Sequence, residues 1–159
     1  MNDPQLIMLC GIPTSGKSTY VENHLLEVEC FDYTILSTDS LIEGYARDNG
    51  TTYDEAFNLH IKNAQRLLTW NLGAAIGANQ NIIWDQTNLT PKARKGKLAL
   101  VPAHYKKTAV WFNISLEDAM IRNQTRPGKI IPPPVLKSMF RSFIPPALHE
   151  GFDKITRGN

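Results

Sequence analysis

Apolar runs of strand length alternate along this chain with longer stretches whose apolar residues recur at helical spacing. The strand-like runs span residues 6–10, 33–37, 81–84 and 107–112. The helix-like stretches span residues 18–27, 54–77, 91–100, 116–126 and 132–143. A short final strand over residues 152–155 is also expected. Strands that alternate with helices predict an α/β fold, with a parallel sheet covered by helices on both faces.

The length and composition are those of one globular unit. The 159 residues are 42% hydrophobic and 20% charged, and they contain no internal repeat or low-complexity stretch. We therefore expect a single domain over residues 1–159 with one core. No apolar run reaches the ~20 residues of a membrane span, so the expected location is the cytoplasm, or the host cytoplasm for a viral protein.

Charge is distributed unevenly along the chain. Residues 1–80 carry four basic and ten acidic side chains, whereas residues 81–159 carry thirteen basic and five acidic ones. The basic residues could form a solvated helical face, or they could line a wall that faces phosphate. The pattern leaves both interpretations open for Lys92, Arg94, Lys95, Lys97, Lys106 and Lys107.

A glycine-rich segment follows the first strand-like run and opens the first helix. Residues 11–19 read G-I-P-T-S-G-K-S-T, a complete GxxxxGK[ST] phosphate-binding loop (P-loop) in the strand, loop and helix context that the motif requires. Its backbone N–H groups turn toward phosphate oxygens, Lys17 reaches the β and γ phosphates, and Ser18 is placed to ligate Mg²⁺. ATP or another nucleoside triphosphate is the expected ligand. The residues predicted to bind it are Gly11, Thr14, Ser15, Gly16, Lys17, Ser18 and Thr19.

Two carboxylates follow the second and third strand-like runs. Ligands of parallel α/β sheets bind beyond the carboxyl ends of the strands, where Asp39 and Asp85 would meet the P-loop. Asp39 is the first candidate for the base that accepts a proton from an alcohol, and the alternative is that Asp39 or Ser40 caps the next helix. Asp85 could hold magnesium through water, orient a residue that binds the acceptor, or act as the base. The residues after it are expected to bind the acceptor or to form an ordinary turn: Gln86, Thr87 and Asn88.

A predicted lid supplies cations. Arg122 and Arg126 are four residues apart on the helix expected before Pro127, and Pro127-Gly128 would form a loop that closes over nucleotide. We place this lid around residues 122–132 and assign both arginines, with Lys17, to stabilising the transferred phosphoryl group. The alternative is an exposed arginine pair on a surface helix.

Several of these segments together resemble one known group of enzymes. The segments are the P-loop, T-D after the second strand, D-Q-T-N-L-T-P after the third, and R-N-Q-T-R-P-G-K-I-I-P-P-P-V-L-K-S-M-F. With them, the chain resembles the P-loop kinase family of phage polynucleotide 5′-kinases over nearly its whole length. The resemblance implies that Lys17 and Ser18 bind triphosphate and magnesium, that Asp39 is the general base, and that Arg122 and Arg126 are lid arginines. It also implies an acceptor-binding arginine three residues after the base, where this chain has Ile42.

The function expected from these residues is an ATP-dependent kinase that phosphorylates a hydroxyl on nucleic acid, with DNA favoured over RNA. A 5′-hydroxyl end is the leading acceptor. A second candidate is a DNA-modification kinase for a 5-hydroxymethyl pyrimidine such as 5-hydroxymethyluracil in phage DNA. Its substrate would be a base that leaves the stack or a single strand. A nucleoside or small-molecule kinase and a non-catalytic nucleotide-binding switch also stay open. The sequence makes no prediction of oligomeric state.

Overall fold

A computed structural model describes residues 3–27 and 33–159 of the chain. Five strands form one parallel sheet in the order β2-β3-β1-β4-β5. The strands are β1 (Gln5–Cys10), β2 (Tyr33–Leu36), β3 (Asn81–Asp85), β4 (Lys106–Trp111) and β5 (Lys154–Arg157). The predicted parallel α/β sheet is therefore confirmed. The last strand begins later than expected, because Phe152 is a buried core residue that precedes β5.

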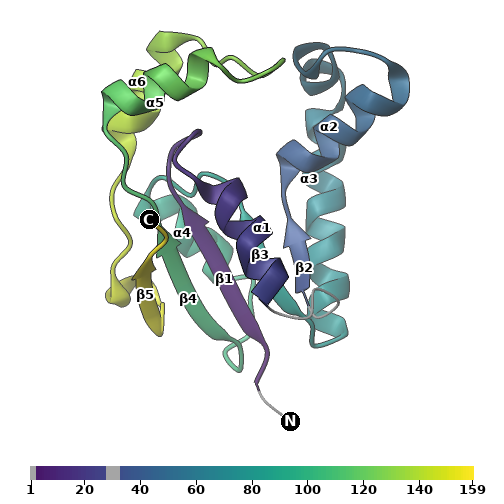
Figure 1. The fold of residues 1–159 in the computed structure, drawn as a ribbon. Helices are drawn as coiled ribbons and strands as arrows, with labels where there is room; N and C mark the ends of the chain where they lie inside the picture. The colour runs from purple at the N-terminus through teal and green to yellow at the C-terminus, as the bar shows by residue number, and fades with distance from the viewer. Residues whose placement is uncertain (1–2, 28–32) are drawn as a thin grey trace.

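Helices cover both faces of this sheet, as predicted. Successive strand residues point to opposite faces, so β1 supplies two cores. Ile7 and Leu9 pack with Val21 of α1 (Lys17–Glu27) on one face. Leu6 and Met8 pack on the other face with α3 (Tyr53–Gly77) and α4 (Pro91–Leu98). Figure 1 shows α1 in front of β1, with α3 and α4 on the far side of the sheet.

The helix α2 (Thr38–Asn49) follows β2 directly and packs on α3. Its N-cap is Ser37, whose side chain accepts a hydrogen bond from the Ser40 N–H at 3.2 Å. Neither Asp39 nor Ser40 is therefore the cap. Asp39 lies in the first turn instead, where the helix dipole favours a carboxylate. Ile42 is fully buried between α2 and α3.

The predicted helix through Arg126 is shorter than expected. The helix α5 (Leu116–Gln124) ends before Thr125, whose N–H bonds to carbonyls of the last turn. Pro127 disfavours helical geometry at the preceding residue, so Arg126 belongs to the connection that leads to α6 (Pro133–Ser142). The expectation that Arg122 and Arg126 share a helix face was therefore wrong.

The Asn123 side chain of α5 holds the connection from α5 to α6 through two hydrogen bonds. The Asn123 side chain donates to the Ile131 carbonyl at 2.7 Å and accepts from the Ile131 N–H at 3.0 Å. In Figure 1 this segment and α2 reach toward each other beyond the carboxyl ends of the strands. Within the described ranges, no helix has the length and apolar character needed to cross a bilayer.

Candidate active site

The P-loop takes its shape from residues with left-handed backbone geometry. Thr14 has φ 71° and Gly16 has φ 105°, which an L side chain adopts only under strain. A methyl group at Gly11 would lie 2.6 Å from Ser15 Oγ, so that position also requires glycine. The loop leads into α1, whose N-terminal N–H groups and dipole favour an anion in front of it.

Lys17 is held inside the loop. Its Nζ donates to the carbonyls of Gly11 at 2.9 Å and Ile12 at 2.8 Å. Burial lowers the pKa of the Lys17 ammonium from 10.5 to about 8, and the carboxylates of Asp85 and Asp39 oppose that shift. Both carboxylates therefore lie within electrostatic range of the ammonium. Among the residues that the structure describes, Lys17 forms no ion pair, so a bound phosphate would supply its adjacent anion.

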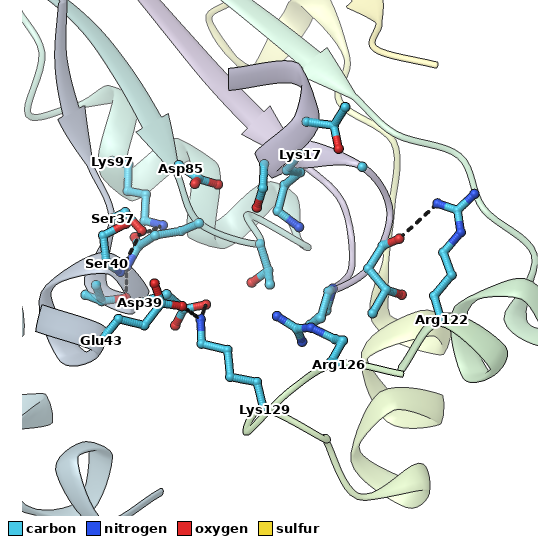
Figure 2. Close-up of a pocket in the computed structure, with 18 residues that line it drawn as sticks. Lys17, Ser37, Asp39, Ser40, Glu43, Asp85, Lys97, Arg122, Arg126 and Lys129 are labelled. Atoms are coloured by element: carbon cyan, nitrogen blue, oxygen red, sulfur yellow. Dashed lines mark hydrogen bonds and ion pairs between the residues drawn. The ribbon is translucent and has the colours of Figure 1, made fainter. Parts of the chain in front are cut away.

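One cavity of about 590 Å³ brings most of the predicted residues together. Figure 2 shows it between the P-loop, α2 and the segment after α5. We call one part of its lining the loop side: Thr14, Gly16, Lys17, Ser18, Thr19, Arg122 and Arg126. We call the opposite part the α2 side: Ser37, Thr38, Asp39, Ser40, Glu43, Lys97 and Lys129. Asp85, Gln86 and Thr87 also line the cavity.

Three predicted residues do not line this cavity, namely Gly11, Ser15 and Asn88. Ser15 is 1% exposed, and its hydroxyl has no partner among the described residues. Asn88 is 2% exposed, and its Nδ2 donates to the Leu9 carbonyl at 2.7 Å. The adjacent Thr87 carbonyl accepts from the Gly11 N–H at 2.9 Å. The position of Asn88 is therefore that of a support behind the P-loop, not of a residue that meets an acceptor.

Asp39 lies at the centre of a cluster on the α2 side. The Tyr53 hydroxyl donates to Asp39 Oδ1 at 2.7 Å, and Lys129 Nζ is 3.9 Å from Asp39 Oδ2. Lys129 also contacts the Glu43 carboxylate, and its Nζ lies 4.6 Å from the centre of the Tyr53 ring. Lys129, from the connection between α5 and α6, thus reaches across the cavity to α2.

The sequence interpretation assigned no role to Tyr53, Glu43 or Lys129. Tyr53 follows the Thr52 cap of α3, and no pattern in the sequence marks it. Lys129 stands in the predicted lid, where its charge beside Pro127-Gly128 was the available signal.

Asp85 and Ser18 both line the cavity and offer oxygen atoms to it. Asp85 ends β3, and its backbone pairs with Leu9 of β1, the strand that leads into the P-loop. Burial raises the pKa of the Asp85 carboxyl above its ordinary value, and Lys17 opposes the shift. Hydroxyl and carboxylate oxygens suit Mg²⁺, which keeps several of its waters, so this donor set fits a magnesium ion that enters with nucleotide.

Arg122 and Arg126, the two arginines predicted to belong to a lid, lie at different places in the site. Arg122 Nη1 donates to the Thr14 carbonyl at 3.2 Å, so Arg122 lies at the outer edge of the P-loop. Figure 2 shows Arg126 directed into the cavity from the segment that follows α5. The two side chains therefore offer separate positive charges on the loop side.

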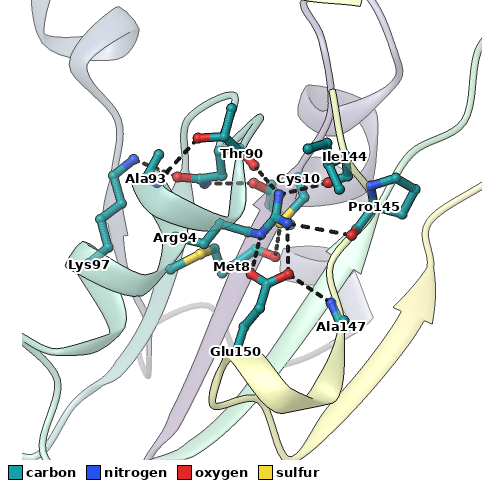
Figure 3. A network of polar contacts seen from close by, with 12 residues as sticks. Met8, Cys10, Thr90, Ala93, Arg94, Lys97, Ile144, Pro145, Ala147 and Glu150 are labelled. Carbon is teal, nitrogen blue, oxygen red and sulfur yellow. Dashed lines mark hydrogen bonds and ion pairs between the residues drawn. The ribbon is translucent and has the colours of Figure 1, made fainter. Parts of the chain in front are cut away.

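The sequence left two interpretations of six basic residues open, a solvated face and a wall that faces phosphate. The structure places these residues in different surroundings. Three are exposed, namely Lys92, Lys95 and Lys106, and Lys107 is half-buried. Arg94 is completely buried and pairs with Glu150 through bonds of 2.7 and 2.8 Å (Figure 3). Both interpretations are therefore wrong for Arg94, which is an interior support. Lys97 is the member of the set that lines the cavity.

The chain is similar to known proteins over most of its length. The model of the AAA_33 family, described as an AAA domain, matches residues 6–146. A candidate kinase from Chloroflexus aurantiacus j-10-fl has a similar structure, with 18% identity, a TM-score of 0.71, and coverage of 99% of this chain and 85% of that chain.

Two further structures have a similar fold. One belongs to the Pnkp1/Rnl/Hen1 RNA repair complex, with 17% identity, a TM-score of 0.69, and coverage of 89% of this chain and 44% of that chain. The other is a gluconokinase from Sinorhizobium meliloti 1021, with 17% identity, a TM-score of 0.55, and coverage of 99% of this chain and 83% of that chain. Likenesses at such low identity establish the fold alone, a five-stranded parallel α/β sheet with helices on both faces.

Proposed function

This chain belongs to the AAA_33 family, and on that premise we propose that it is an ATP-dependent kinase that transfers the γ-phosphate to an alcohol. One observation carries the proposal: a P-loop lysine and a carboxylate from α2 line the same cavity from opposite sides. The carboxylate of Asp39, like that of Asp85, opposes the lowering of the Lys17 pKa that burial causes. An alcohol between them would meet both a base and the terminal phosphate.

The proposed reaction is an in-line phosphoryl transfer. Asp39 accepts the proton of the acceptor hydroxyl, whose oxygen forms a bond to the γ-phosphorus. The bond from that phosphorus to the β–γ bridging oxygen breaks, and ADP leaves with the electron pair. Lys17 and Arg126 stabilise the charge of the transferring group. Arg122 donates to the Thr14 carbonyl of the P-loop and adds positive charge beside the bound nucleotide. Ser18 would hold Mg²⁺, which neutralises charge on the β and γ phosphates.

The proposed acceptor is a hydroxyl on nucleic acid, with a 5′-hydroxyl end as the leading candidate. The sequence resemblance and the structural likeness to a component of an RNA repair complex support this class. A hydroxymethyl group on a pyrimidine base is a second candidate, favoured by Ile42. That side chain is fully buried, so position 42 offers no cation to a phosphate beside a terminal hydroxyl.

A panel of acceptors tests the proposal. The protein is incubated with γ-labelled ATP and, separately, with 5′-hydroxyl DNA, 5′-hydroxyl RNA, duplex DNA that contains 5-hydroxymethyluracil, free nucleosides and gluconate. We expect label on nucleic acid, located by nuclease digestion, and no label with Lys17→Ala or Asp39→Ala. Transfer to nucleosides or gluconate alone would replace the proposal with a small-molecule kinase, and full activity of Asp39→Ala would reassign the base.

A further inference from the structure

Arg94 and Lys97 are both basic residues of α4 that are wholly or partly shielded from solvent, but their surroundings differ. Arg94 is paired with the Glu150 carboxylate and also donates to the Asn88 and Ile144 carbonyls at 2.8 and 2.9 Å. Burial raises the pKa of Glu150, but the hydrogen bonds from Arg94 and from the Ala147 N–H, together with the Arg94 charge, hold that pKa below its ordinary value. Arg94 is therefore a neutralised charge in the interior.

Lys97, one turn further along the helix, has no such counter-charge. Its Nζ donates to Gln86 Oε1 at 2.6 Å and to Asn88 Oδ1, which are both uncharged oxygens. Within residues 3–27 and 33–159, the ion pairs do not include Lys97. Burial lowers the pKa of the Lys97 ammonium from 10.5 to about 8, because the charged form loses water without gaining a carboxylate.

The ammonium retains a donor for a ligand. A lysine ammonium has three N–H donors, and the two amide oxygens use two of them. The Trp84 ring lies beneath the ammonium, with its centre 5.4 Å from Nζ, and Lys97 lines the cavity. Lys97 thus presents a partly desolvated positive charge to the cavity.

This charge lies on the α2 side, next to the proposed base. Gln86, which accepts from Lys97, donates through Nε2 to Thr38 Oγ1 at 3.1 Å, and Thr38 directly precedes Asp39. Figure 2 shows Lys97 at the end of the cavity beside Ser37 and Ser40, with Arg122 at the opposite end. A ligand that reaches Lys97 therefore occupies the acceptor part of the cavity.

Other cations that line the cavity are already engaged or serve the loop side. Lys129 contacts the carboxylates of Glu43 and Asp39, and Lys17 is held by the loop carbonyls. A partly buried ammonium without a carboxylate gains more from an incoming anion than an exposed one, because the local dielectric is lower. The anion with the matching hydrogen-bond acceptors in a nucleic acid is a phosphate group.

We propose that Lys97 binds a phosphate group of the acceptor and so orients the acceptor hydroxyl toward Asp39. This inference rests on the proposed function. The phosphate could be a phosphodiester of a strand or the phosphate of a mononucleotide. Lys97 would thereby favour acceptors that carry phosphate over free sugars and nucleosides, by binding a part of the acceptor that does not react.

The test compares wild type with Lys97→Met, which keeps the apolar stem over Trp84 and removes the charge. The substrates are the labelled nucleic-acid acceptor and a series of the same acceptor with one uncharged methylphosphonate at each linkage that flanks the hydroxyl. We expect the substitution Lys97→Met to raise the acceptor KM by about 10- to 100-fold, with the KM for ATP unchanged. One methylphosphonate should cost wild type a similar factor and should cost the variant nothing more. Lys95→Met, an exposed lysine of the same helix, is the matched control and should behave as wild type.

Further arms distinguish the outcomes. A nucleoside 3′-monophosphate that outperforms its nucleoside in wild type, but not in Lys97→Met, would support the phosphate of a mononucleotide as a sufficient ligand. Equal methylphosphonate costs in both proteins would overturn the phosphate site and leave the kinase proposal intact. Transfer to gluconate or free nucleosides alone would overturn both. Thermal melting measures the stability that Lys97→Met loses when the Asn88 and Gln86 side-chain oxygens lose their donor. Lys97→Gln, a second neutral variant whose amide can still donate to those oxygens, must give the same KM pattern.

Discussion

The loop side and the α2 side of the cavity differ in how many segments of the chain form them. The loop side comes mainly from one continuous segment, in which backbone N–H groups, a helix N-terminus and Lys17 face the site. The α2 side is assembled from side chains of separate elements: Asp39 of α2 accepts a hydrogen bond from Tyr53 of α3 and lies near Lys129 of the connection between α5 and α6. The loop side should therefore bind nucleotide by itself, whereas the α2 side needs the complete tertiary structure to work.

The strongest test of this difference compares Asp39→Asn with Lys17→Met. The Asp39 change should lower kcat by about 10²- to 10⁴-fold, the usual contribution of a general base, and leave the ATP Kd near the wild-type value. Lys17→Met should lower kcat and also weaken ATP binding. Labelled-ATP turnover and titration calorimetry measure the two effects. Equal losses of ATP affinity in both variants would show that the two sides are not separable.

A stability test addresses what supports the loop side. Arg94 holds the segment around Asn88, which bonds to β1 just before the P-loop. Arg94→Met leaves the Glu150 carboxylate buried and unpaired, which should cost about 3–5 kcal/mol of unfolding free energy. Urea denaturation measures it, with Lys95→Met as an exposed control. A loss below about 1 kcal/mol would mean that Glu150 regains water when the arginine is removed.

A smaller effect on turnover is expected when the hydrogen bond that positions Asp39 is removed. Tyr53→Phe removes the hydroxyl that donates to Asp39 and keeps the ring beneath Lys129. The loss of a hydrogen bond to a charged group should lower kcat by about tenfold, with the ATP Kd unchanged. Tyr45→Phe is the matched control, because Tyr45 stacks on His60 away from the cavity. A drop in ATP affinity for Tyr53→Phe would contradict a role confined to the α2 side.

The smallest effect is a pH dependence of nucleotide binding. The pKa of Lys17 is lowered to about 8, so the free protein holds this charge below that pH and loses it above. Phosphate stabilises the ammonium, so binding above pH 8 takes up a proton. The affinity for ATP should then fall about fourfold between about pH 7 and about pH 8.5. Calorimetry in buffers of different ionisation enthalpy measures how many protons the protein takes up when ATP binds. Lys97→Met, which removes the other lysine with a pKa of about 8, must leave the dependence unchanged.

The sequence by itself determined the features that depend on neighbouring residues. The alternation of apolar runs predicted a parallel sheet with helices on both faces. The P-loop could be recognised because its phosphate-binding groups belong to one segment, whose glycines and lysine have a required spacing. The position of Asp39 after β2 also followed, since strand ends of a parallel sheet meet at one edge.

Only the tertiary structure decided the features that join distant residues. Lys129 meets Asp39 across ninety positions of sequence, and Arg94 meets Glu150 across fifty-six. A basic residue in a helix looks the same in sequence whether its partner is water, a buried carboxylate or a cavity. Arg94 and Lys97, three residues apart, therefore could not be separated until β3, α4 and the segment before β5 were packed together. Burial and the presence or absence of a counter-charge, which are properties of packing, made one a support and the other a candidate ligand-binding residue.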